Sequence, residues 1–232
     1  MDDWLADTRT SYDTVAESYA DVVRDALGHD PYLAGSLRLF AGLVQGGPAK
    51  SGRPLAQGGP AESGRPLVQG GPVADVGCGP GHVTAFLDGL GLDAFGLDLS
   101  PGMIEVARRE HPGLRFEVGS MTDLPLPDAS LGGLVAFWSL IHIPDDELGG
   151  VLGHFRRVLR PGAPLLAGFH VGDTDTLKTQ GYGGHPMRVR VRRREPERMA
   201  EHLRSAGFAV EACLLMDVDT PTPGAAMFGR RP

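Results

Sequence analysis

A glycine-rich turn and an acidic residue that follows it are the first residues that could bind a ligand. Residues 73–81 read VADVGCGPG, an apolar run that ends in glycines. Because glycine accepts positive φ angles and lets a backbone approach a ligand closely, this segment predicts a strand followed by a binding turn. Asp98 ends the next apolar run, where its carboxylate can accept hydrogen bonds from both hydroxyls of a ribose and repel a 2′-phosphate.

Both features also have a simpler structural interpretation. Glycine-rich turns occur as plain bends, and Asp98 or Ser100 could merely cap the helix that Pro101 begins. The dinucleotide fingerprint needs glycines at its first, third and sixth positions. Here they fall at the first, third and fifth, and His82 takes the sixth position. The turn therefore argues against a nicotinamide-dependent dehydrogenase.

The elements around these residues predict a doubly wound α/β fold. Apolar strands alternate with helices after residue 72, which indicates a mostly parallel sheet with its ligand site at the carboxyl ends of the strands. The last two strands are joined by a segment too short for a helical crossover, so they should form an antiparallel pair. We expect seven strands, one of them antiparallel near the C-terminus. Predicted strands are 72–77, 94–98, 114–118, 133–138, 163–169, 208–216 and 225–230, and predicted helices are 82–89, 102–110, 146–159 and 195–206.

The residues before the sheet divide into a helical part and a repeat. Apolar spacing predicts helices over 10–27 and from 31 to about 44. A 12-residue unit then recurs, as QGGPAKSGRPLA at 45–56 and QGGPAESGRPLV at 57–68. Units this rich in Gly and Pro do not bury an apolar face as solenoid repeats do, so a linker is favoured over an interaction tether. We expect N-terminal lid helices at 1–44, a linker at 45–71 and a Rossmann-like domain at 72–232.

Composition and charge narrow the possible functions. The 232 residues are 41% hydrophobic, enough for one sizeable core, but no apolar run is long enough to cross a bilayer and no export signal is recognisable. With two cysteines, neither a disulfide framework nor a cysteine zinc site is expected, and a cytoplasmic location fits. The eight histidines form no close ligand pair, so no metal is expected. The net charge of −7 argues against nucleic-acid binding.

Five segments together resemble the class I S-adenosylmethionine-dependent methyltransferases, especially the branch that methylates small molecules. They are DVGCGPG (75–81), GLDLSPGMIEVAR (96–108), VGSMTDLPLPDASLGGL (118–134), WSLIHIP (138–144) and RVLRPGAPLL (157–166). The segment YDTVAESY (12–19) also looks like the family's lid over the cofactor. The resemblance covers about residues 72–170 and implies S-adenosyl-L-methionine as the cofactor.

The resemblance implies where each part of this cofactor would bind. Asp75, Gly77 and Gly79 would border the methionyl part, and Asp98 would hold the ribose. Leu99 and Met103 would flank the adenine, and Ser120 and Met121 would lie at its edge. The family often has an acidic residue where Ser120 stands, so one adenine contact is in doubt. Tyr12 would close over the sulfonium, since an aromatic face suits a cation. The implied cofactor-binding residues are Tyr12, Asp75, Gly77, Cys78, Gly79, Gly81, Asp98, Leu99, Met103, Ser120, Met121, Trp138 and Ser139.

The implied reaction is direct, in-line transfer of a methyl group to an oxygen, nitrogen or carbon atom of a small-molecule acceptor. The protein would align the nucleophile and exclude water. A weakly acidic acceptor would benefit from a general base, and histidine has a suitable pKa. His142 and His170 are the candidates because both follow strands at the expected ligand edge, with packing or cofactor-pocket roles as the alternative.

The segment after His170 is the expected acceptor pocket, at about 171–194. We predict an irregular loop over 172–187, with Tyr182 and His185 as candidate substrate contacts and ordinary loop positions as the alternative. An arginine-rich run follows, for which a solvated edge is favoured because no aromatic residues interleave with it. A carboxylated acceptor could still be attracted to it. The run comprises Arg188, Arg190, Arg192, Arg193, Arg194 and Arg198.

Two further functions remain open at this point. A quinone-ring carbon methyltransferase shares the same cofactor motifs, and only the reaction product separates it from other acceptor classes. A regulator that binds the cofactor without catalysis is the alternative from a different class. The intact glycine turn and Asp98 argue against the loss of function that a regulator implies.

Overall fold

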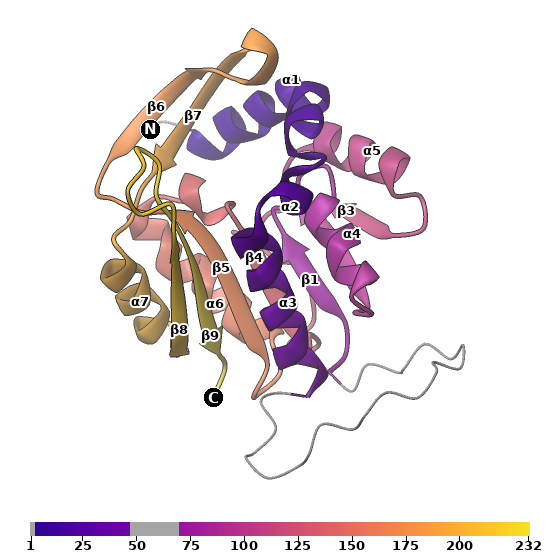
Figure 1. Ribbon diagram of the computed structural model, residues 1–232, viewed down its shortest axis with the longest axis vertical. Helices are drawn as coiled ribbons and strands as arrows, with labels where there is room; N and C mark the ends of the chain where they lie inside the picture. The colour runs from indigo at the N-terminus through magenta and orange to yellow at the C-terminus, as the bar shows by residue number, and fades with distance from the viewer. Residues whose placement is uncertain (1–2, 47–69) are drawn as a thin grey trace.

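One seven-stranded sheet with helices on both faces forms the body of the protein (Figure 1). The computed structural model describes residues 3–46 and 70–232. The strand order is β3-β2-β1-β4-β5-β9-β8, and β9 alone runs antiparallel to its neighbours, which confirms the predicted fold class and the antiparallel final pair. The strands are β1 (Val73–Val76), β2 (Ala94–Asp98), β3 (Arg115–Val118), β4 (Gly133–Phe137), β5 (Pro164–His170), β8 (Ala209–Met216) and β9 (Gly224–Arg230).

Side chains that alternate along the buried strands build a separate core on each face of the sheet. Val73 packs with one set of helices, and its neighbour Ala74 packs with the other set. This is the period of two that a strand imposes, and it explains why strands buried on both faces read as unbroken apolar runs. The first core includes α3 (Pro31–Gln45) and α4 (His82–Gly89), and the second includes α6 (Asp145–Val158) and α7 (Pro196–Ser205).

The N-terminal helix forms a separate layer above the sheet edge. Helix α1 (Trp4–Val23) begins six residues before the predicted start at residue 10, because the Asp3 side chain caps it by accepting from the backbone N–H of Ala6. It also ends earlier than predicted and is followed by the short α2 (Ala26–His29). Val15 of α1 packs against Met103 of α5 (Pro101–Glu110), so the lid rests on the helix that follows β2.

The prediction of an irregular segment over 172–187 is wrong. Strands β6 (Asp175–Gln180) and β7 (Pro186–Arg192) form an antiparallel hairpin, joined through the short turn η2 (Tyr182–Gly184). Met187 and Val189 alternate with arginines and pack under α1, whereas Arg188 and Arg190 are exposed. This alternation was a readable strand signal. Figure 1 shows the hairpin beside α1 at the top of the molecule.

Most of the predicted linker at 45–71 lies outside the described residues, which resume at Gly70. A Cβ atom placed on Gly70 would lie 2.9 Å from the carbonyl oxygen of Val44. The two ends that the linker joins therefore meet at one place beside the sheet. Within residues 3–46 and 70–232, no helix is both long and apolar enough to span a bilayer.

Candidate functional site

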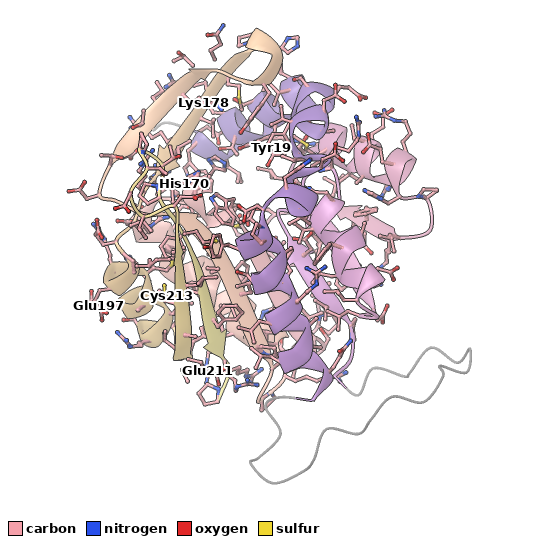
Figure 2. All side chains as sticks on the ribbon, viewed as in Figure 1. Tyr19, His170, Lys178, Glu197, Glu211 and Cys213 are labelled. Atoms are coloured by element: carbon pink, nitrogen blue, oxygen red, sulfur yellow. The ribbon has the colours of Figure 1, made fainter. Side chains whose placement is uncertain are left out.

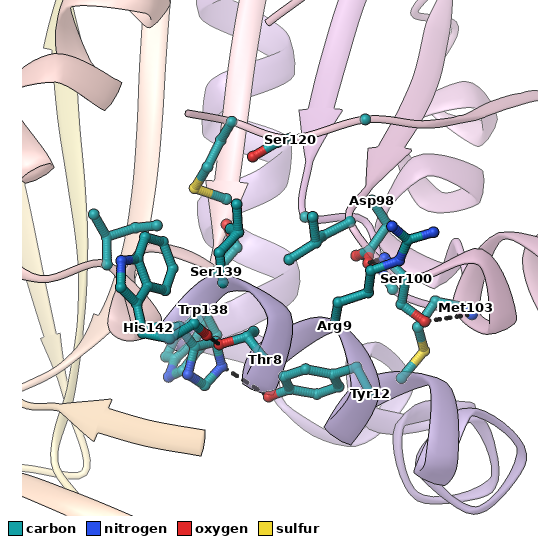
Figure 3. Close-up of a pocket in the computed structure, with 18 of the residues that line it drawn as sticks. Thr8, Arg9, Tyr12, Asp98, Ser100, Met103, Ser120, Trp138, Ser139 and His142 are labelled. Atoms are coloured by element: carbon teal, nitrogen blue, oxygen red, sulfur yellow. Dashed lines mark hydrogen bonds between the residues drawn. The ribbon is translucent and has the colours of Figure 1, made fainter. Parts of the chain in front are cut away.

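A cavity of about 720 Å³, open to solvent, lies between α1 and the carboxyl ends of β1, β2 and β4. This is the edge at which doubly wound sheets bind their ligands. Eleven of the residues singled out from the sequence line it: Tyr12, Gly77, Gly79, Asp98, Leu99, Met103, Ser120, Met121, Trp138, Ser139 and His142. Figure 3 shows α1 and the ends of the strands contributing opposite walls.

The glycine turn has a backbone that only glycine adopts readily. Gly77, Gly79 and Gly81 have φ angles of +79°, +53° and +85°, in the left-handed region that L side chains avoid. A Cβ on Gly77 would lie 2.3 Å from the Cβ of Ser139, so β1 and the end of β4 approach too closely for any side chain. Gly81 does not line the cavity but caps the start of α4.

Asp98 presents a half-buried carboxylate at the cavity wall. One oxygen accepts from the backbone N–H of Gly79 at 2.8 Å, and the other accepts from that of Ser100 at 2.9 Å. Burial raises the pKa of Asp98, although these two N–H donors lower it. Because a carboxylate oxygen can accept two hydrogen bonds, each oxygen retains capacity for a hydroxyl in the cavity.

Asp75 is held behind the turn, outside the cavity lining. Its carboxylate is 1% exposed and accepts a hydrogen bond of 2.7 Å from the Thr84 hydroxyl at the start of α4. Burial raises the pKa of Asp75 to about 7. The side chain therefore ties the turn to α4. Cys78 likewise points away from the cavity, packing with Ile104 and Phe116.

The end of β4 carries the strained residue Trp138. Its φ is +55°, which for a bulky residue costs about 1–2 kcal/mol. The backbone N–H of Trp138 donates to Gly168 at 2.9 Å and its indole N–H donates to Nδ1 of His170 at 3.3 Å, and these bonds hold the indole against the cavity. Strain of this kind is common where a structure positions functional groups.

His142 meets the lid across the cavity (Figure 3). It ends the short turn η1 (Leu140–His142), and its Nε2 lies 2.8 Å from the hydroxyl of Tyr12. Its Nδ1 lies 2.8 Å from the carbonyl oxygen of Arg190, which can only accept, so Nδ1 carries the proton and Nε2 accepts from Tyr12. Burial lowers the pKa of His142 to about 4 and raises that of Tyr12, which keeps both groups neutral.

The other three predicted residues lie outside this cavity lining. His170 lies on the far side of the Trp138 indole, at the end of β5. Tyr182 packs its ring edge-on against Tyr19 of α1, with ring centroids 4.7 Å apart, and Lys178 lies over its face. His185 is exposed in the hairpin turn. Figure 2 labels Tyr19, Lys178 and His170 in these positions.

Sequence reasoning missed much of the lid's contribution. Trp4 and Thr8, which it missed, precede the predicted Tyr12 at intervals of four, so the three residues share one face of α1. Recognising Asp3 as the helix cap would have extended the helix far enough to reveal them. Lining residues that were not singled out as site residues are Trp4, Leu5, Thr8, Arg9, Tyr19, Ser100, Gly119, Phe137 and Ile143.

Over residues 3–46 and 70–232, no group of three or more His, Cys, Asp or Glu side chains is placed to hold a metal ion. The described lining of the cavity combines glycine backbone, one half-buried carboxylate and several aromatic rings. Such a lining fits a ribose, an apolar base and a compact cation.

Comparison with known proteins relates the central part of this chain to methyltransferases. Residues 73–162 match the family model of the methyltransferase domain. The malonyl-[acyl-carrier protein] O-methyltransferase of Yersinia pestis is 36% identical over 94 residues, which are 40% of this chain and 34% of that protein. O-methyltransferase cnsE of Penicillium expansum is 38% identical over 108 residues, 44% of this chain and 38% of that protein. The chain thus spans about a third of the length of the curated relatives it matches.

Solved structures extend the likeness over nearly the whole chain. The structure of the DhpI–SAH complex superposes with a TM-score of 0.69 at 20% identity, covering 99% of this chain and 98% of that chain. A TehB-like SAM-dependent methyltransferase of Corynebacterium glutamicum gives a TM-score of 0.62 at 20% identity, covering 94% and 98%. These identities show a shared fold, and the domain match supplies the sequence evidence. Residues 73–162 therefore match a methyltransferase domain, and the chain shares the fold of a solved S-adenosylmethionine-dependent methyltransferase.

Proposed function

We propose that this protein binds S-adenosyl-L-methionine in the cavity under α1 and transfers its methyl group to a small-molecule acceptor. The observation that carries the proposal is the half-buried Asp98 carboxylate, oriented by Gly79 and Ser100 and open to the cavity. The two neighbouring hydroxyls of a ribose can both donate hydrogen bonds to such a carboxylate. The relatives named above act as O-methyltransferases, which agrees with this reaction class.

The residues of the chain fit each part of this cofactor. Gly77 and Gly79 expose backbone at the cavity wall, which a ligand chain can approach closely, and Leu99 and Met103 offer apolar surface for an adenine. The bound cofactor supplies an activated methyl group on a sulfonium. Tyr12 and Trp138 present aromatic faces to the same cavity, which stabilises a cation by about 0.5–2 kcal/mol.

The remaining lining suggests a compact and largely apolar acceptor. Trp4, Phe137 and Ile143 provide apolar walls, and Arg9 is the one lysine or arginine among the described residues that line the cavity. A carboxylate on the acceptor would suit Arg9. The arginine-rich run is not part of this lining, so Arg9 replaces it as the candidate contact for a carboxylated acceptor.

His142 is the proposed proton acceptor when the acceptor has a proton to lose. Tyr12 already donates to Nε2, so an acceptor hydroxyl that donates to the Tyr12 oxygen can pass a proton onward as Tyr12 gives its own to His142. This relay moves one proton and leaves Tyr12 unchanged. We place His170 outside the reaction, because Trp138 stands between it and the cavity.

A quinone-ring acceptor is the second candidate. The demethylmenaquinone methyltransferase of Renibacterium salmoninarum is 33% identical over 94 residues, 40% of this chain and 39% of that protein. A flat ring would also fit between the aromatic walls of the cavity. Mass spectrometry of products from phenol, carboxylate and quinone acceptors separates the two candidates, because ring methylation leaves the oxygen atoms unmodified.

Isothermal titration with S-adenosylmethionine, its demethylated product and NAD tests the proposed function. We expect saturable binding of both adenosyl ligands, weakened about a hundredfold or more by Asp98→Ala, because two hydroxyls lose a charged acceptor. Asp93→Ala is the matched control, since Asp93 is exposed at the start of β2. Binding of NAD alone, or equal affinity in both variants, would contradict the proposal. Adenosyl binding without turnover over the acceptor panel would indicate a regulator.

A further inference from the structure

Two residues of the arginine-rich run, Arg192 and Arg194, donate hydrogen bonds to the turn that carries His142. Arg194 is 2% exposed, and its guanidinium donates to the carbonyl oxygens of Leu140 and Ile143. Arg192 donates to the carbonyl oxygen of His142 itself at 2.7 Å. The two arginines are two residues apart on an extended chain, so they reach the same side. Three of the carbonyl oxygens of residues 140–143 are therefore held by these two side chains.

The same strand also holds the ring of His142. The carbonyl oxygen of Arg190 accepts from Nδ1 at 2.8 Å, which directs the lone pair of Nε2 toward Tyr12. His142 is thus fixed at two points, its backbone by Arg192 and its ring by Arg190. The His142 ring keeps this orientation only while the backbone of His142 stays in its present position beside β7.

Arg192 can hold the His142 backbone in that position. Only 13% of its side chain is exposed, and its Nε lies 3.4 Å from Asp175 of β6, which orients the guanidinium. Loss of the bond from Arg192 to His142 would release the turn from β7 on the side nearest the ring. The Nδ1–H bond to Arg190 would then lengthen, and the opposite tautomer, with the proton on Nε2, would become accessible.

We propose that Arg192 is a positioning residue, which holds the His142 backbone so that the ring keeps Nδ1 protonated and offers Nε2 as the acceptor toward Tyr12 and the cavity. The inference deepens the proposed function, and it rests on that function only for its effect on turnover. It gives the arginine-rich run a role in ordering the site, in place of the solvated edge that the sequence favoured.

Long-range ¹H–¹⁵N correlation spectra of the histidine rings test this proposal in the full chain, both alone and saturated with S-adenosylhomocysteine. His142→Gln assigns the ring signals. In the unsubstituted protein we expect a protonated Nδ1 and an unprotonated Nε2. In Arg192→Gln we expect the ratio of the two tautomers to shift by about tenfold or more toward Nε2–H, because a charge-assisted bond is lost.

Arg193→Gln is the matched control. Arg193 is the next residue, and it also donates one guanidinium bond to a backbone carbonyl, that of Pro221 at 2.8 Å. We expect this variant to keep the Nδ1–H signals, and Arg192→Lys to restore them in part. Thermal unfolding confirms that each variant is folded, and if Arg192→Gln does not fold, Arg192→Lys against Arg193→Lys gives the same comparison.

Two results would overturn the proposal: unchanged Nδ1–H signals in a folded Arg192 variant, or an equal shift in the Arg193 variant. Neither depends on methyl transfer. Failure of the proposed function would appear separately, as absence of adenosyl-ligand binding in the unsubstituted protein. With an acceptor that turns over, kcat of Arg192→Gln should fall by about tenfold to a hundredfold, as expected for a misplaced reacting group.

Discussion

At the scale of single residues, the geometry of the site requires a particular amino acid at several positions. Gly77 combines a φ of +79° with a Cβ position 2.3 Å from Ser139. Asp98 combines partial burial with two backbone donors. Asp75, by contrast, uses its carboxylate to tie the turn to Thr84 and stays outside the lining. Neighbouring residues of one motif therefore have different tasks.

Gly77→Ala should destabilise the protein by about 2–4 kcal/mol, since it adds both backbone strain and a clash with Ser139. Urea unfolding measures this free energy. Gly153→Ala is the control, because Gly153 lies in α6 with nothing within 4 Å of the added Cβ, and it should stabilise by about 0.5–1 kcal/mol. Equal effects of the two substitutions would show that the turn is not constrained.

Asp75 makes stability depend on pH. Its pKa of about 7 in the folded protein exceeds the unfolded value of about 3.9, so the folded state favours the protonated form. The stability that this protonation contributes is fully present below pH 4 and is lost as the pH rises through 7.

Replacement of Asp75 by Asn should remove this pH dependence. Between pH 5 and pH 8, the unsubstituted protein should lose roughly 2–3 kcal/mol of unfolding free energy relative to Asp75→Asn. Chemical unfolding of both proteins across that range measures the difference. A constant difference between the two proteins would mean that the pKa of Asp75 is not raised.

At the scale of elements, the lid is tied to the domain on three sides. Asp13 of α1 accepts from the Ser100 hydroxyl and from the backbone N–H of Gly102, so it caps α5 from outside. Ser11 accepts from the backbone N–H of Arg188 in β7, and Trp4 donates to Glu147 of α6 at 2.7 Å. Helix α1, which forms one wall of the cavity, is therefore anchored to α5, to the hairpin and to α6.

Asp13→Ala should loosen α1 from α5, because two donors at the start of α5 lose their shared acceptor. We expect a loss of about 1 kcal/mol in stability and faster hydrogen exchange of α1 amides. Asp21→Ala is the control, since Asp21 forms an exposed pair with Arg24, and such surface pairs contribute little to stability. Equal exchange rates in α1 of both variants would contradict an anchoring role.

At the scale of the whole molecule, the sheet, the lid and the hairpin meet around one cavity. The chain leaves the lid helices at Gly46 and returns at Gly70, beside Val44. The connection therefore begins and ends at the same place, on the side of β1 where the strand starts. The positions of the described residues therefore do not require a connection of any particular length.

Replacement of residues 47–69 by six Gly and Ser residues should raise the unfolding free energy by about 1 kcal/mol, because a shorter flexible connection costs less closure entropy. Affinity for S-adenosylhomocysteine should stay within about twofold of the original. Calorimetry and titration measure both quantities. The tether interpretation of the repeat would gain support if shortening it lowered stability or affinity.

The sequence by itself determined the seven strands of the main sheet, the helices after residue 72 and the antiparallel final pair, because apolar period and turn residues act locally. It also located the glycine turn and Asp98, since motif spacing sets the start of α4 and the end of β2. Only the tertiary structure decided which side chains share the cavity. Tyr12 meets His142 across 130 positions of sequence, and β7 sets the tautomer of that ring. Such contacts depend on how separate elements pack, which no local pattern records.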